Sequence, residues 1–182
     1  METNSLKDLY LDELKDLYDA EQQIIKALPN LIDAASSEEL QNALTEHLET
    51  TKQQAERLEQ IFETMGEKAK GKKCKGMEGV IKEGSEVIEE NDDDEVRDAG
   101  IISAAQRVEH YEIAAYGTVR TYATLLGDEE SAELLEQTLH EEKEADRKLT
   151  ELAEQINVEA AKGQAREQAP AKKSVSRGKR VA

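Results

Sequence analysis

The fold is decided by two stretches, LKDLYDAEQQIIKAL at residues 14–28 and AQRVEHYEIAAYGTV at residues 105–119. They match at a constant offset of 91 residues, which places Glu21 and Glu112 at equivalent positions. Apolar residues recur in both stretches at steps of three and four, a spacing that predicts a helix with one buried face. Each of these two helices therefore carries a glutamate within the face that should be buried.

The same offset relates a second pair of segments further along the chain, where Thr51 and Gln54 match Glu142 and Ala145. The chain is therefore predicted to contain a helical hairpin followed by a second copy of it. Bundles of this kind build metal sites from a Glu on two helices and a Glu-x-x-His on the other two. The arrangement of such a site is present here, but neither second helix has the histidine at the expected position.

The apolar periodicity and the turn residues together predict five helices. Their expected ranges are residues 6–31, 36–65, 77–90, 95–126 and 129–157. Ser36 and Glu39 have the spacing of a capping box, and Pro29 should kink or close the last turn of the first helix. The segment 66–94 is too long for a hairpin loop. We expect an all-α, ferritin-like up-down four-helix bundle with a long crossover carrying a fifth short helix.

Composition limits the class of protein. The chain has 182 residues and two prolines, enough for one domain with a hydrophobic core. No apolar run approaches the roughly 20 residues that span a bilayer, and residues 1–7 lack a signal-peptide pattern. The single Cys74 fits a reducing compartment, so a cytoplasmic location without membrane attachment is predicted. Lysines around Cys74 should lower its pKa and raise its reactivity, although a solvated loop is the simpler interpretation.

The net charge of −17 is unevenly distributed. Residues 163–182 contribute +5, so the remainder carries −22. We divide the chain into a helical domain at 1–161 and a basic tail, predicted to be disordered, at 162–182. The acidic body argues against nucleic-acid binding across its surface. The tail has no aromatic residues to stack on bases, which leaves salt-dependent attachment to DNA as the alternative to a solvated tail without function.

A set of inward-facing acidic residues should lie in one layer of the bundle. The predicted metal ligands are Glu21, Glu109, Glu112, Glu142 and Asp146. Carboxylates this close repel one another in a low dielectric unless they are protonated, hydrogen-bonded or neutralised by a cation. Their hard oxygen atoms suit Fe, Mn, Mg or Ca ions, and Fe or Mn is the predicted cofactor. The alternative is that each glutamate is only partly buried or paired with Lys or Arg.

Further polar residues should surround this layer and support the ligands. They are Tyr18, His47, Thr51 and Gln54. His47 lies on the buried stripe, where packing as a core histidine is favoured over a role as a ligand, and where it could instead orient a neighbouring carboxylate. Tyr18 lies one turn before Glu21, within reach of a carboxylate, although packing explains its position equally well.

Several motifs occur together in a fixed order. They are LYLDEL at 9–14, DAEQ at 19–22, EHLE at 46–49, KKCKGM at 72–77, QRVEHYE at 106–112 and EEK at 141–143. In these motifs the chain resembles the YciE/YciF family of ferritin-like stress proteins across residues 5–160. The resemblance implies a five-helix ferritin-like fold, a homodimer and a cytoplasmic stress setting. It implies no established reaction, and Thr51, Gln54 and Ala145 replace ligands that ferritin-like di-iron sites use.

Two functional hypotheses follow from these observations. The first is a stress-response protein whose carboxylate-rich site binds one or two Fe or Mn ions, with peroxide or oxygen reduction as the expected chemistry. The second is a metal-free helical dimer that acts as an interaction module or a DNA-associated stress module. Whether the protein is an enzyme is left open by the sequence.

Overall fold

The protein is all-α, as predicted. The computed structural model describes residues 5–167, with side chains as far as Lys162. The helices in this part of the chain are α1 Leu6–Ala34, α2 Glu38–Thr64, α3 Lys75–Glu90, α4 Asp94–Leu126 and α5 Glu129–Glu167. None of these described helices is both long enough and apolar enough to cross a bilayer.

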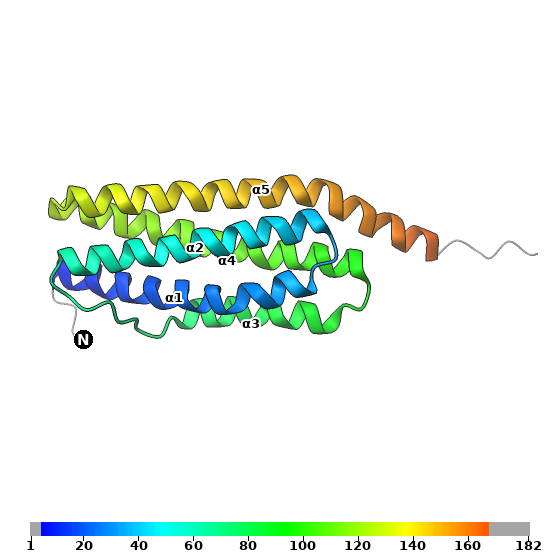
Figure 1. Ribbon diagram of the computed structural model, residues 1–182, viewed down its shortest axis with the longest axis horizontal. Coiled ribbons are helices and arrows are strands. Elements are labelled where there is room, and N and C mark those ends of the chain that lie inside the picture. Colours follow the sequence, from blue (N-terminus) through cyan, green and yellow to red (C-terminus); the bar gives the residue numbers. More distant parts are fainter. Residues whose placement is uncertain (1–4, 168–182) are drawn as a thin grey trace, which may run out of the picture.

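Four of the helices form an up-down bundle, and the fifth lies on its outside (Figure 1). In the bundle α1 packs against α2 and α4, while α5 packs against α4 and α2. The short helix α3 lies against α1 and α4. This arrangement confirms the predicted four-helix bundle and the crossover that carries a fifth helix. Contacts with α1, α3 and α5 also explain why α4 is apolar around much of its circumference.

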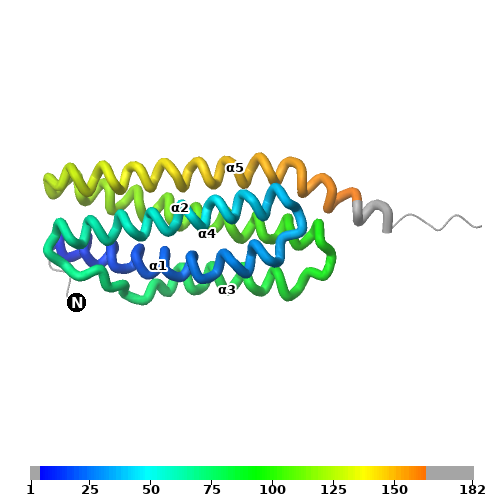
Figure 2. Tube along the Cα trace, in the orientation of Figure 1, coloured from blue at the N-terminus to red at the C-terminus, as the bar shows by residue number. Residues whose placement is uncertain are grey.

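The crossover begins with an extended segment at residues 65–74 that runs beside α1 before α3 starts (Figure 2). The Lys72 amide donates to the Lys15 carbonyl at 3.0 Å. At Gly71 the segment lies so close to α1 that an added Cβ would stand 2.8 Å from the Cβ of Asp19. A glycine is therefore required there for close approach, and the crossover is attached to the first hairpin rather than looping freely.

Two apolar clusters lie on either side of a polar layer. One includes Leu17, Phe62 and Tyr116, and the other includes Ile24 and Leu149. Burial of these side chains contributes about 1.5–3 kcal/mol for each large residue. The two clusters hold the ends of the bundle together, so the helices stay in place although the layer between them is polar.

The start of α2 differs from the prediction by one residue. The N-cap is Ser37, whose hydroxyl accepts from the Leu40 amide, rather than Ser36. Ser36 instead donates from its amide and its hydroxyl to Asp98 at 2.8 and 2.7 Å. Asp98 accepts a third hydrogen bond, from the Ser37 amide at 2.7 Å. A buried carboxylate of α4 therefore fixes the turn between α1 and α2.

Two helices continue beyond their predicted C-terminal ends. α1 continues through Pro29 to Ala34. Proline removes one backbone hydrogen-bond donor, but packing holds the turns on either side of it in the helix. α5 continues past residue 157 to Glu167, through a segment rich in the good helix formers Ala, Lys, Gln and Glu. The rest of the predicted basic tail, residues 168–182, lies outside the described residues.

We predict that Asp98→Ala lowers the free energy of unfolding by about 2–4 kcal/mol, because three donors of the turn between α1 and α2 lose a buried, charged acceptor. Urea unfolding followed by circular dichroism measures this. Asp92→Ala, at an exposed position just before α4, is the matched control and should change stability by less than about 0.5 kcal/mol. Equal effects of the two substitutions would contradict the assigned role of Asp98.

Candidate metal centre

The polar layer is built by acidic residues at the middle of three bundle helices. α1 contributes Glu21, α4 contributes Glu109 and Glu112, and α5 contributes Glu142. All four are buried, with exposed fractions of 0 or 1%. Ionisable side chains are almost never fully buried unless they are paired. A group of four carboxyls in one layer therefore demands a physical explanation.

His47 joins this layer from α2. One potential ligand atom from each of His47, Glu109, Glu112 and Glu142 lies within 4.8 Å of every other. The Nε2 atom of His47 is 3.3 Å from Oε1 of Glu109, but this contact lacks the geometry of a hydrogen bond. His47 precedes Thr51 by one helical turn, so α2 supplies an imidazole about two turns before Gln54, the position at which the Glu-x-x-His pattern would place it.

The polar atoms of this group are largely without hydrogen bonds. Apart from a neighbouring glutamate in its protonated form, no donor within the described part of the chain reaches either oxygen of Glu112 or of Glu142. Three further atoms also lack a hydrogen bond: one oxygen of Glu21, one oxygen of Glu109 and Nε2 of His47. Leaving a buried polar atom unsatisfied costs about 1–3 kcal/mol, and more when the group is charged. Such a concentration of unpartnered atoms at one point is typical of a site that binds a ligand.

Burial and mutual repulsion hold these carboxyls in their protonated form. Burial raises the pKa of Glu21, Glu109 and Glu112 well above the usual range, and the charge of neighbouring glutamates raises it further. Burial also raises the pKa of Glu142 to about 7. A cation in the layer would reverse this balance, because it stabilises the ionised form of each carboxyl.

His47 is neutral near pH 7. Burial, together with the positive charge of Lys148, lowers the pKa of His47 to about 4. A neutral imidazole with a free nitrogen is the form that binds metal ions. The electrostatics of this histidine therefore favour ligation rather than an ion pair with Glu109.

Two further contacts orient the group. The Tyr116 hydroxyl, fully buried on α4, donates to Oε1 of Glu21 and leaves Oε2 unpartnered. Arg57 on α2 binds both oxygens of Glu141 on α5, at 2.6 and 2.8 Å. This bidentate pair joins α2 to α5 beside the layer. The charge of Arg57 also acts to lower the pKa of Glu21 and of Glu142, but burial raises both pKa values by more.

The structure brings most of the proposed ligands together. Glu109, Glu112 and Glu142 meet in the group, and Glu21 contacts Glu112 closely enough to share a hydrogen bond when one of them is protonated. Asp146 lies apart: its Oδ1 accepts from Gln106 at 3.1 Å and lies 3.3 Å from the exposed His110.

The proposed supporting residues have varied surroundings. Thr51 donates to the His47 carbonyl at 2.8 Å, which fixes the turn that presents the imidazole. Gln54 donates to Glu141 at 3.2 Å, beside Arg57. The Tyr18 hydroxyl donates to Glu59 at 2.6 Å, away from the carboxylate group.

Sequence reasoning missed two of the contacts that orient the group. Tyr116 lies four residues after Glu112, and a buried tyrosine one turn from a buried glutamate is a usable signal. Arg57 lies three residues after Gln54, on the same side of α2. The sequence also assigned His47 a supporting role, whereas its imidazole lies among the potential ligands.

The environment of Cys74 differs from the prediction. Its side chain is fully buried at the N-cap of α3, with Sγ 3.0 Å from the Tyr111 hydroxyl. Burial raises the pKa of the thiol, so the expectation of a lysine-activated, reactive cysteine is wrong. Lys72 and Lys73 instead pair with Asp12 and Glu78.

The donor set fits a hard divalent metal ion. Carboxylate oxygens with one imidazole nitrogen suit iron, manganese or zinc and disfavour Cu(I), which prefers sulfur ligands. The unpartnered atoms of His47, Glu109, Glu112 and Glu142 would ligate one ion, and Glu21 lies beside Glu112 to contribute to a second.

Comparisons with known proteins agree with this architecture. Protein YciF of Escherichia coli (strain K12) is 49% identical over 154 residues, which cover 84% of this chain and 93% of that protein. The crystal structure of the E. coli stress protein YciF matches with a TM-score of 0.81 at 48% identity, covering 84% of this chain and 97% of that one.

Two further structures share the fold. YcfI of Rhodopseudomonas palustris matches with a TM-score of 0.81 at 46% identity, covering 82% of this chain and 95% of that one. A protein of Xanthomonas campestris pv. campestris, 22% identical, matches with a TM-score of 0.71 over 91% of this chain and all of that one, which shows the fold alone. The model of the family described as Domain of unknown function (DUF892) matches residues 5–162. The chain therefore belongs to the DUF892 family, and the resemblance to YciF-type proteins is confirmed.

Proposed function

We propose that this protein is a stress-response protein that binds one or two divalent ions, iron or manganese, within its helical bundle. One observation carries the proposal: the potential ligand atoms of His47, Glu109, Glu112 and Glu142 converge within 4.8 Å while most of them lack a hydrogen bond. A stress setting is supported by the similarity to YciF, which is described as a stress protein.

The roles of individual residues follow from their contacts. His47 presents a neutral nitrogen, held in place by the Thr51 hydrogen bond to its carbonyl. Tyr116 fixes one oxygen of Glu21 and leaves the other for an ion. Glu142, with a pKa of about 7, releases its proton most readily when a cation enters. A bound iron or manganese ion would supply the electron transfer by which peroxide or oxygen is reduced.

The alternative, a metal-free helical module, gains less support from the structure. The apolar surface of α4, which such a module would offer to a partner, is covered by α1, α3 and α5. The large apolar side chains exposed in the described region are only Leu125, Leu126 and Val158. The homodimer, the cytoplasmic location and the attachment of the tail to DNA stay predictions.

We predict that Glu112→Gln lowers the affinity for Mn(II) by about 10- to 100-fold or more, as loss of a metal-supporting group does elsewhere. Because glutamine is neutral without holding a proton that the unfolded chain releases, the same substitution should stabilise the metal-free protein at pH 8. Isothermal titration and thermal unfolding measure the two effects. Glu133→Gln, at an exposed position on α5, is the control and should change neither. A substituted protein that loses stability and keeps its affinity would contradict the proposal.

We predict that the metal-free protein loses stability as the pH rises. The folded state keeps its carboxyls protonated above pH 4.5, where the unfolded chain releases these protons. The resulting stability is fully present below pH 4.5; it is lost through about pH 7 for Glu142, and as the pH rises through the raised pKa of each of the others. Each such carboxyl changes the free energy of unfolding by at most about 1.4 kcal/mol per pH unit.

Urea unfolding of EDTA-treated protein between pH 5 and pH 8 measures this slope. Saturating Mn(II) should reverse its sign, since binding to ionised ligands strengthens as protons leave. Glu142→Gln should reduce the slope of the metal-free protein. A metal-free protein that is most stable at pH 8 would contradict the assignment of buried, protonated carboxyls.

A further inference from the structure

Two hollows reach the metal centre, and both are lined by His47 and Glu109. The first lies among α1, α3 and α4, has a volume of about 30 Å³ and is otherwise lined by small or aliphatic residues. The second lies between α2 and α5 and has a volume of about 200 Å³. Its polar lining includes Glu46, Glu141, Glu144 and Lys148. Only the second has both the size and the polar surface that suit a partly hydrated cation.

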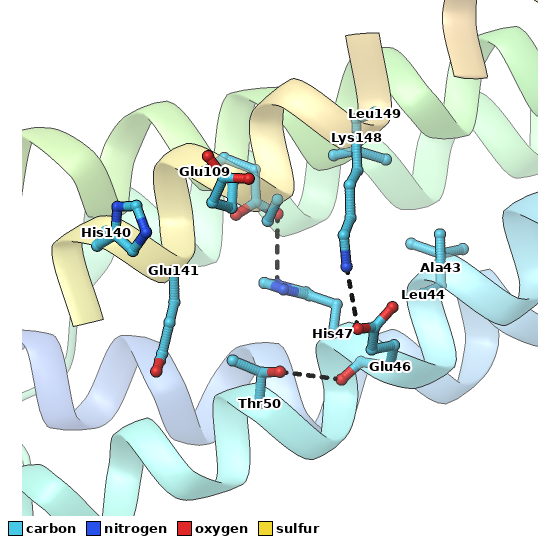
Figure 3. Close-up of a pocket in the computed structure, with 12 residues that line it drawn as sticks. Ala43, Leu44, Glu46, His47, Thr50, Glu109, His140, Glu141, Lys148 and Leu149 are labelled. Carbon is cyan, nitrogen blue, oxygen red and sulfur yellow. Dashed lines mark hydrogen bonds and ion pairs between the residues drawn. The ribbon is translucent and has the colours of Figure 1, made fainter. Parts of the chain in front are cut away.

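The second hollow reaches two of the potential ligands, His47 and Glu109. Figure 3 shows His47 and Glu109 facing each other there, while Lys148 reaches from α5 to Glu46 on α2. Glu109 is 1% exposed, and one of its oxygens has no hydrogen bond in the described structure. An unpartnered, buried ligand atom therefore borders a cavity that leads to the surface between two helices.

Small residues create this hollow. Ala145 lies three residues after Glu142, on the same side of α5, at the position where the Glu-x-x-His pattern would place a histidine. Ala43 lies four residues before His47 on the facing helix α2. A larger side chain at either position would occupy the space beside the ligands. The missing histidine thus leaves an opening next to the site.

The rim of the hollow carries carboxylates that are each held by a cation. Lys148 pairs with Glu46 at 2.9 Å, and both side chains are largely exposed. Arg57 pairs with Glu141, and Arg147 pairs with Glu144 at 2.8 Å. The Lys148–Glu46 pair joins the two helices across the hollow. Because both charges stand at its rim, the lysine repels an incoming cation and the glutamate attracts one.

We propose that the hollow between α2 and α5 is the route by which a divalent metal ion enters and leaves the centre, and that Lys148 slows this passage. This inference rests on the proposed metal-binding function. It assigns Ala43 and Ala145 the role of keeping the route open, without contact with the bound ion. Substitutions of these residues should therefore change rates of binding and release while leaving the equilibrium affinity intact.

The test follows Co(II) binding to the full-length metal-free protein by stopped-flow absorption. Ala145→Leu should slow binding by about tenfold or more, because entry then requires the helices to move apart. Release of Co(II) into excess EDTA should slow by the same factor, which leaves the dissociation constant unchanged. Ala43→Leu fills the route from the opposite helix and should have the same effect, so the result does not depend on one variant folding well.

Two control substitutions test the position of the route and the effect of charge at its rim. Ala27→Leu makes the same change of side chain in the small apolar hollow and should leave both rates unchanged. Lys148→Ala should speed Co(II) binding several-fold at low salt, and the difference should disappear at about 1 M salt, where charges are screened beyond about 3 Å.

The route is refuted if Ala145→Leu and Ala43→Leu load Co(II) at the unsubstituted rate, or if Ala27→Leu slows loading in their place. It is also refuted if these variants change only the release rate, and with it the dissociation constant, since their residues would then shape the site itself. A wild-type protein that binds no Co(II) would overturn the proposed function as well, which distinguishes the two failures.

Discussion

The structure depends on how four glutamates and a histidine are tolerated in one buried layer. Carboxyl groups in a low dielectric cannot all be ionised beside one another, so they keep their protons or bind a cation. In this protein most of their oxygen atoms lack hydrogen bonds within the described chain, and the imidazole of His47 is neutral. The layer therefore lowers the stability of the bundle, because its polar atoms are placed to bind a ligand and not to hydrogen-bond to one another.

The rest of the fold makes this layer sustainable. Apolar clusters on both sides hold the helices together, and the bidentate Arg57–Glu141 pair joins α2 to α5 next to the layer. At the far end of the first hairpin, Asp98 fixes the turn from α1 to α2. These contacts hold His47 and the glutamates in fixed positions although the carboxyl groups of the layer repel one another when they are ionised. Such preorganisation is what a metal centre requires of its scaffold.

Much of the architecture was readable in the sequence because it is periodic. The 91-residue offset located both hairpins, and the apolar stripes placed Glu21 and Glu112 correctly in the buried interior. What escaped prediction depends on contacts between distant segments. The cap at Ser37 instead of Ser36 follows from Asp98, about 60 residues away. The burial of Cys74 against Tyr111 was hidden because the neighbouring lysines dominate the local sequence.

The site itself was predictable only in part, for a related reason. Helical spacing alone puts Asp146 one turn from Glu142, and His47 one turn from Thr51. It cannot decide whether the side chain of Asp146 or that of His47 points toward the other helices. In the structure Asp146 contacts Gln106 near the surface, whereas His47 lies among the buried carboxyls. The choice is made by the rotation of each helix in the bundle, which the whole set of packing contacts determines.

Metal binding by this layer is tested most directly by anomalous diffraction from crystals soaked in Mn(II). We expect an anomalous peak within ligand distance of His47, Glu109, Glu112 and Glu142, with any second peak beside Glu21. A layer without such a peak in crystals that bind Mn(II) elsewhere, for instance at the surface pair of Asp146 and His110, would contradict it.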